Sequence, residues 1–314
     1  MLVATALRVK AAPMGILVPA YFDPPSAFWS ELDSAAGRVP LVAIMNPNDG
    51  PDTTQNPNYV NAIHSLHAAG GRVIGYVFTS YGARDTNVVK ADIDRYFSFY
   101  SVDGIFLDEM TNDKNTGHLN YYAALYQYIQ SKGTNLLIVG NPGINTQEDY
   151  LARPAANALV TFESDSGYAA LTVDGWVTNH LARQFSHLPF NVPSATAMTN
   201  YVNLAASRNV GWIYVTDDVL PNPWDTLPPY WTEEVDYIRS LNQSAPATQL
   251  KILSVSNRVP SIQITGAPGT YELQATTNLS SWSSLTNVST ATNTARVQDT
   301  GATNTAKRLY RTRQ

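Results

Sequence analysis

The sequence contains no cysteine and few charged residues. Of its 314 residues only 14% are charged, and the net charge is −5. The lack of cysteine excludes disulfide bonds, thiolate metal sites and a thiol nucleophile, and it leaves the redox compartment open. The negative charge disfavours a nucleic-acid phosphate backbone as partner and is compatible with a cationic polymer.

Several other signals are absent. No apolar run approaches the 18 or more residues of a membrane helix, so we expect no membrane span. No serine lies in a nucleophile-elbow pattern, and no glycine-rich turn of the dinucleotide-binding kind follows a strand. His64 and His67 share a helix face but have no third ligand nearby, so we expect neither a metal site nor a cofactor.

Aromatic residues, by contrast, are plentiful. The chain has 18 tyrosines and 6 tryptophans. Polar aromatic rings cover the flat faces of sugar rings, and they also occur in ordinary packing, so composition leaves both interpretations open.

Short apolar segments alternate with helical patterns from residue 15 to about residue 242. The expected strands are Gly15–Tyr21, Pro40–Met45, Arg72–Phe78, Asp103–Asp108, Leu136–Gly140, Ala158–Phe162, Gln184–Leu188 and Gly211–Thr216. A helix is expected after each strand, including one over Val173–Leu181 between the sixth and seventh strands. Eight such repeats in about 230 residues predict an α/β fold, a (β/α)₈ TIM barrel, with an open doubly wound sheet as the alternative.

The composition and the hydrophobic pattern of the sequence change after the expected barrel. Residues 244–314 are rich in Thr, Ser and Asn and show period-two strands separated by turn residues, which predicts a small C-terminal all-β, sandwich-like module. The expected strands are Lys251–Ser256, Ser261–Thr265, Tyr271–Thr276, Ala295–Asp299 and Arg308–Thr312. The expected divisions are therefore a leader or disordered remnant over 1–14, a catalytic barrel over 15–243 and this module over 244–314.

Polar side chains follow most of the predicted strands. The carboxyl ends of barrel strands converge on one mouth, and a mouth rich in acids, amides and tyrosines suits a sugar. The residues predicted to bind substrate there are Tyr21, Asn46, Asp49, Tyr76, Thr79, Tyr81, Arg84, Asn141, Asp217, Asp218 and Trp224. Asp217 and Asp218 could equally cap a helix instead of binding substrate. Arg84 could keep Asp108 or Glu109 ionised, and an ion pair on the surface is the equal alternative.

Two adjacent carboxylates, Asp108 and Glu109, end the fully apolar fourth strand, and Glu163 ends the sixth. A lone acid at a strand end commonly caps a helix, but a pair at the end of a buried strand needs a partner or a task. Glycoside hydrolysis uses two carboxylates on either side of the scissile bond. Strands two steps apart place inward-pointing acids within roughly the 5–9 Å that spans retaining and inverting enzymes, so Glu163 is a candidate partner of Asp108 or Glu109.

The ordered motifs of the barrel also resemble a known family. They are similar to motifs of the spherulation-specific family 4 (spherulin-4) proteins, which form glycoside hydrolase family 135. The segments that carry the resemblance are Leu17–Phe22, Ile44–Pro51, Gly75–Arg84, Asp103–Glu109, Gly140-Asn-Pro-Gly143 and Phe162-Glu163. The resemblance covers about residues 15–242. It implies an endo-acting glycosidase for α-1,4-linked galactosamine and N-acetylgalactosamine polymers of the biofilm type, secreted or at the cell surface.

The resemblance assigns roles to the three acids. It implies Asp108 as nucleophile or charge stabiliser, Glu163 as general acid/base and Glu109 as a group that orients the substrate, with exchange of Asp108 and Glu109 as the alternative. The expected partner is a hexosamine-containing polysaccharide, and we expect a monomer. The alternative functions are a non-catalytic carbohydrate-binding barrel and a surface adhesive protein in which the β module is the active part.

Overall fold

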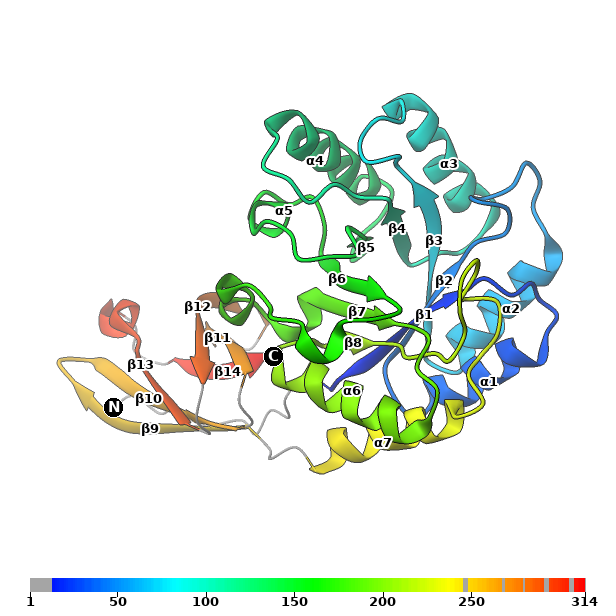
Figure 1. The fold of residues 1–314 in the computed structure, drawn as a ribbon. Coiled ribbons are helices and arrows are strands. Elements are labelled where there is room, and N and C mark those ends of the chain that lie inside the picture. The colour runs from blue at the N-terminus through cyan, green and yellow to red at the C-terminus, as the bar shows by residue number, and fades with distance from the viewer. Residues whose placement is uncertain are drawn as a thin grey trace. The chain divides into compact units, whose positions relative to one another are not determined.

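A computed structural model describes residues 13–244, 248–266, 269–278, 280–290, 294–304 and 308–313. The chain divides into two compact units (Figure 1). One comprises Met14–Asp174 and Gln184–Arg239. The other comprises Gly175–Arg183 and the described part of Ser240–Gln314. The second unit therefore includes a segment between the sixth and seventh strands of the barrel as well as the C-terminal residues.

The first unit is a closed barrel of eight parallel strands in sequential order, with helices outside the strands (Figure 1). The predicted (β/α)₈ TIM barrel is therefore confirmed. The strands are β1 (Gly15–Ala20), β2 (Leu41–Met45), β3 (Arg72–Phe78), β4 (Gly104–Asp108), β5 (Leu137–Gly140), β6 (Ala158–Ser164), β7 (Phe185–Pro189) and β8 (Trp212–Ile213).

The strands form because their residues are apolar on both faces. Every residue of β1 and β2 is buried, as expected when side chains fill the barrel on one face and meet helices on the other. Gly75 in β3 shows how close this packing is, since a Cβ built there would lie 2.6 Å from the Tyr96 ring. The helices are α1 (Ala27–Ala36), α2 (Pro57–Ala68), α3 (Thr86–Phe99), α4 (Thr116–Gln130), α5 (Asp149–Ala152), α6 (Ala195–Ser207) and α7 (Trp231–Ser244).

Two elements of the barrel differ from the expectation. The helix predicted over Val173–Leu181 is absent, and a short 3₁₀ turn, η2 (Gly175–Asn179), takes its place. Two further 3₁₀ turns, η1 (Tyr168–Ala170) and η3 (Ala182–Gln184), lie before and after it. This segment holds Gly, Asp, Thr and Asn, which are poor helix formers. The eighth strand is also shorter than predicted, because beyond it the Val215 N–H donates to the Glu234 side chain at 3.0 Å instead of to a neighbouring strand.

The second unit contains two three-stranded antiparallel sheets, ordered β13–β10–β9 and β12–β11–β14. Their strands are β9 (Gln249–Ser256), β10 (Val259–Thr265), β11 (Gly269–Thr276), β12 (Ser283–Thr290), β13 (Thr294–Gln298) and β14 (Leu309–Arg313), and η4 (Thr300–Asn304) is a 3₁₀ turn. Apolar residues of both sheets form one core, among them Ile262, Leu273 and Tyr310. Strand β12 was not predicted, because only Leu285 and Val288 are apolar within it.

No helix in the described part of the chain is long and apolar enough to cross a membrane. Within the same residues, no group of three or more His, Cys, Asp or Glu side chains is arranged to hold a metal ion.

Candidate active site

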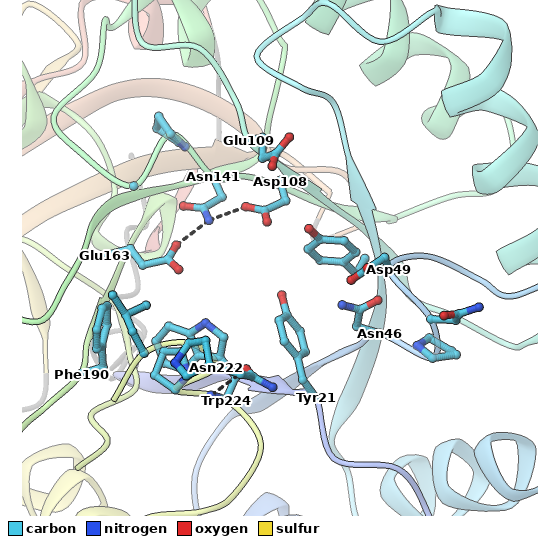
Figure 2. Close-up of a pocket in the computed structure, with 18 of the residues that line it drawn as sticks. Tyr21, Asn46, Asp49, Asp108, Glu109, Asn141, Glu163, Phe190, Asn222 and Trp224 are labelled. Atoms are coloured by element: carbon cyan, nitrogen blue, oxygen red, sulfur yellow. Dashed lines mark hydrogen bonds between the residues drawn. The ribbon is translucent and has the colours of Figure 1, made fainter. Parts of the chain in front are cut away.

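A cavity of about 830 Å³ opens at the carboxyl ends of the barrel strands (Figure 2). It is lined by segments that follow seven of the eight strands, together with residues of the strands themselves. All three predicted catalytic acids and seven of the eleven predicted substrate-binding residues line it. The lining residues that were predicted are Tyr21, Asn46, Asp49, Tyr76, Tyr81, Asp108, Glu109, Asn141, Glu163 and Trp224.

Asp108 and Glu163 are joined by one amide group. Asp108 ends β4, Glu163 lies in β6, and Asn141 follows the intervening strand β5. The side-chain nitrogen of Asn141 lies 2.6 Å from Asp108 Oδ1 and 2.6 Å from Glu163 Oε2 (Figure 2). The two bonded oxygens are therefore at most about 5.2 Å apart.

The two acids differ in their electrostatic surroundings. Burial, and after it the negative charge of Asp108, raises the pKa of Glu163 from 4.5 to about 7, against hydrogen bonds from Asn141 and Trp224. Burial also raises the pKa of Asp108, but hydrogen bonds from Tyr76, from the Glu109 backbone N–H and from Asn141 oppose that rise. Hydrogen bonds to the ionised form favour ionisation. Ionisation is therefore easier at Asp108, and Glu163 keeps its proton to higher pH.

Two tyrosines stand beside the acids. The rings of Tyr21 and Tyr76 meet edge to face, with centroids 5.6 Å apart. Burial raises the pKa of both hydroxyls above their usual value of 10, and the charge of Asp108 adds to the rise. Both side chains therefore keep their protons and can donate hydrogen bonds in the cavity.

Glu109 has a different position from its neighbour. Its backbone is in the left-handed region (φ 52°), and its carbonyl oxygen accepts hydrogen bonds from the Tyr81 N–H and the Thr79 hydroxyl. Its side chain lines the cavity but points away from Asp108 and Glu163 (Figure 2). The geometry thus pairs Asp108, and not Glu109, with Glu163.

Four residues predicted to bind substrate do not line the cavity. Thr79 is fully buried, and its hydroxyl is bonded to the carbonyl oxygens of Asp108 and Glu109. The Arg84 guanidinium forms an ion pair with Asp92 at 2.5 Å and stacks on the Phe78 ring, so it neither reaches nor ionises the acids. The remaining two, Asp217 and Asp218, follow β8 outside the lining, where Asp218 accepts a hydrogen bond from Thr226 at 2.5 Å.

Eleven lining residues were not among those predicted to bind substrate, and all of them lie in segments that follow strands. They are Asp23, Pro47, Asn48, Pro142, Gly143, Ile144, Phe190, Leu220, Pro221, Asn222 and Pro223. The Pro- and Asn-rich turn at 221–223 was the available signal, because such residues mark a loop and loops at this end of a barrel build the site. Asn222 stabilises this loop, since its side-chain oxygen accepts a hydrogen bond from the backbone N–H of Trp224 at 3.1 Å.

The charged side chains that line the cavity are all acidic. Five carboxylates line it, and none of its described lining residues is Lys, Arg or His. Carboxylates with no cation among them favour a ligand that is neutral and rich in hydroxyls, or one that is positively charged.

Comparisons with known proteins identify relatives of the barrel. The family model described as "Spherulation-specific family 4" matches residues 15–238. Spherulin-4 of Physarum polycephalum is 33% identical over 245 residues, which cover 74% of this chain and 72% of the relative.

Two solved structures share the fold. Sph3 of Aspergillus clavatus, solved in complex with GalNAc, is 23% identical with a TM-score of 0.63, and the match covers 73% of this chain and 99% of that one. The cyclic alpha-maltosyl-(1-->6)-maltose hydrolase of Arthrobacter globiformis is 11% identical with a TM-score of 0.52, and the match covers 92% and 100% of the two chains.

Proposed function

The chain belongs to spherulation-specific family 4, and from this premise we propose that it is an endo-acting glycoside hydrolase. Its proposed substrate is a polysaccharide of α-1,4-linked galactosamine and N-acetylgalactosamine. The observation that carries the proposal is the pair of carboxylates, Asp108 and Glu163, held on one amide inside a cavity at the catalytic end of a TIM barrel.

The distance between the two acids supports a retaining reaction. Retaining enzymes hold their carboxyl groups about 5–5.5 Å apart, whereas inverting enzymes leave about 6.5–9.5 Å for a water molecule. The Asn141-bonded oxygens of Asp108 and Glu163 are at most about 5.2 Å apart. This separation suits direct attack by one carboxylate on the sugar.

In the first step Asp108 attacks the anomeric carbon and forms a glycosyl ester while the glycosidic bond breaks. Glu163 gives its proton to the departing oxygen, which leaves as a hydroxyl of the second sugar. In the second step Glu163 takes a proton from water, the water oxygen bonds to the anomeric carbon, and the ester bond to Asp108 breaks. The reaction needs Asp108 ionised and Glu163 protonated, which is the order that their surroundings favour.

The substrate class is supported by the chemistry of the lining. Tyrosine and tryptophan rings such as Tyr21, Tyr76 and Trp224 cover sugar faces, and the carboxylates tolerate the ammonium group of an unacetylated hexosamine. The relative Sph3 was solved with GalNAc, a sugar of this class. We propose that the mature enzyme acts outside the cell or at its surface, as a monomer, on such a polymer.

The test is release of reducing ends from partly deacetylated galactosaminogalactan. The wild type should cleave it, and Asp108→Asn and Glu163→Gln should each lower kcat by at least about 1,000-fold with the fold intact. Glu109→Gln should lose less, because Glu109 points away from the pair. Glu31→Gln, on the exposed face of α1, is the matched control and should behave like the wild type.

Proton NMR of the first products would show the stereochemistry, and an α-anomer as the initial product is expected for retention. Near-normal turnover by either Asp108→Asn or Glu163→Gln would refute the assignment of the pair. A folded wild type that binds hexosamine polymers and never cleaves them would favour the carbohydrate-binding alternative.

A further inference from the structure

Asn141 is the shared neighbour of both acids, and its position is fixed by the backbone. Its N–H donates to the Leu107 carbonyl oxygen at 2.8 Å, and its carbonyl oxygen accepts from the Met110 N–H at 2.9 Å. Both partners flank the catalytic end of β4. The residue is 7% exposed, so its side chain has little freedom to move away from the acids.

The amide nitrogen has two hydrogens, and each points to a different acid. Both contacts measure 2.6 Å, which is short for an N–H donor. The amide oxygen of Asn141 is buried and has no hydrogen-bond partner among the described residues. The reverse orientation would place that oxygen against the Asp108 carboxylate, so the nitrogen-inward orientation is the one that this charge favours.

We propose that Asn141 is a positioning residue that selects the reacting oxygen of each acid. It keeps Asp108 Oδ1 and Glu163 Oε2 as hydrogen-bond acceptors. The remaining oxygens, Asp108 Oδ2 and Glu163 Oε1, face the open centre of the cavity (Figure 2). Asp108 Oδ2 is then the atom that attacks, and Glu163 Oε1 is the atom that carries and delivers the proton.

The chemistry of a protonated carboxyl group gives the reason. Such a group has one carbonyl oxygen, which is the better acceptor, and one hydroxyl oxygen. An N–H held at Glu163 Oε2 therefore favours the carbonyl form there and places the proton on Oε1. A proton on Oε2 would be turned toward the amide and away from the glycosidic oxygen.

Asn141 also supplies the positive end of a dipole in a place that holds no cation. The groups that face the two acids are the Tyr76 hydroxyl from β3, the Glu109 backbone N–H after β4, Trp224 from the loop after β8, and Tyr21 from β1. The Glu109 carboxylate adds a negative charge nearby, and none of the described lining residues is basic. Removing the amide should therefore raise the pKa of both acids.

The direct test is a neutron structure of the deuterated full-length protein near pH 6, where Glu163 holds its proton. The deuteron should lie on Glu163 Oε1, and density for it on Oε2 would overturn the proposal. This measurement needs no substrate. It therefore separates a failure of this inference from a failure of the proposed function, on which the catalytic meaning of the two oxygens rests.

The second test compares Asn141→Ala with Asn48→Ala, an asparagine on the exposed rim of the same cavity. Carbon-13 NMR of the Glu163 carboxyl, assigned with Glu163→Gln, should show the pKa rising from about 7 in Asn141→Ala and staying unchanged in Asn48→Ala. Asn141→Ala should also lower kcat about 10- to 100-fold, with a smaller change in KM.

If Asn141→Ala does not fold, Asn141→Ser provides the same comparison with a smaller polar side chain. A folded variant whose Glu163 titrates as in the wild type would overturn the proposal. A merely structural role would lower the melting temperature without moving that titration.

Discussion

The Tyr76 hydroxyl donates a hydrogen bond to the carboxylate of Asp108 from the neighbouring strand of the barrel. Tyr76 is 9% exposed, its ring lies against Phe106 of β4, and it meets the Tyr21 ring edge to face. Because burial raises the pKa of Tyr76, the phenol stays protonated and acts as a donor at any pH at which an enzyme works. Its effect is to favour the ionised form of Asp108, which the proposed attack requires.

Tyr76→Phe should therefore raise the pKa of Asp108 and shift the acidic limb of kcat/KM toward higher pH. A hydrogen bond to a charged group contributes about 1.5–3 kcal/mol, which corresponds to a loss of about 10- to 100-fold in kcat/KM at low pH. Tyr128→Phe is a matched control, because it also removes a hydroxyl-to-carboxylate bond, the 2.8 Å contact with Asp94 on the exposed surface. An acidic limb that stays in place in Tyr76→Phe would contradict this role.

Arg84 does not line the cavity, and its contacts predict that it stabilises the fold. It forms a mostly buried ion pair with Asp92, stacks on Phe78 at 4.0 Å and donates to the Phe78 carbonyl oxygen at 3.0 Å. Arg84→Ala should lower the free energy of unfolding by about 2–4 kcal/mol, since it leaves a buried carboxylate with fewer partners. The pH dependence of turnover should stay as in the wild type.

Urea denaturation of Arg84→Ala, compared with Arg153→Ala on the exposed surface, measures this effect. The control should change the free energy of unfolding by no more than about 0.5 kcal/mol. A shifted pH profile in Arg84→Ala, with little loss of stability, would instead support the role that the sequence suggested, an arginine that keeps the acids ionised.

The barrel and its acid pair were predictable because both depend on local pattern. Buried parallel strands are apolar throughout, so each short run such as Ile105–Leu107 identifies a strand without knowledge of its neighbours. Once the order of strands is that of a barrel, residues at their carboxyl ends must converge. Asp108, Glu163 and Asn141 could therefore be placed at one mouth from their positions in the chain.

The remaining features depend on side-chain direction, which the pattern does not contain. Arg84 and Tyr81 follow the same strand, yet one turns to a buried carboxylate on α3 and the other to the cavity. Whether Asp108 or Glu109 pairs with Glu163 was equally open from the sequence, and the Asn141 amide, which bonds Asp108 and Glu163, shows which one does. The bridge that the Asn141 amide forms between the two acids could not be predicted either, because it depends on the distances from Asn141 to both β4 and β6. Strand β12 was missed because its polar composition resembles that of a loop.

Because the pKa of Glu163 is raised, we expect ionisation of Glu163 to lower the free energy of unfolding of the protein. In the folded chain this pKa is about 7, above its usual value of 4.5, so between these pH values the folded state retains a proton that the unfolded state has released. A group with a raised acid pKa therefore makes the free energy of unfolding fall as pH rises through this window. The full penalty is present above about pH 7, and none is present below about pH 4.

Glu163→Gln removes this penalty, because an amide of nearly the same shape stays neutral at every pH and its oxygen can still accept from Asn141. At pH 8 the free energy of unfolding of the variant, measured by urea denaturation, should exceed that of the wild type by about 2–3 kcal/mol. At pH 4 the two values should be equal. Glu31→Gln, where the acid is exposed, should show no such pH-dependent difference. An equal difference between Glu163→Gln and the wild type at both pH values would mean that packing, and not ionisation, determines the change. A gain that appears only at high pH would instead show that ionisation of the buried Glu163 lowers the stability of the fold.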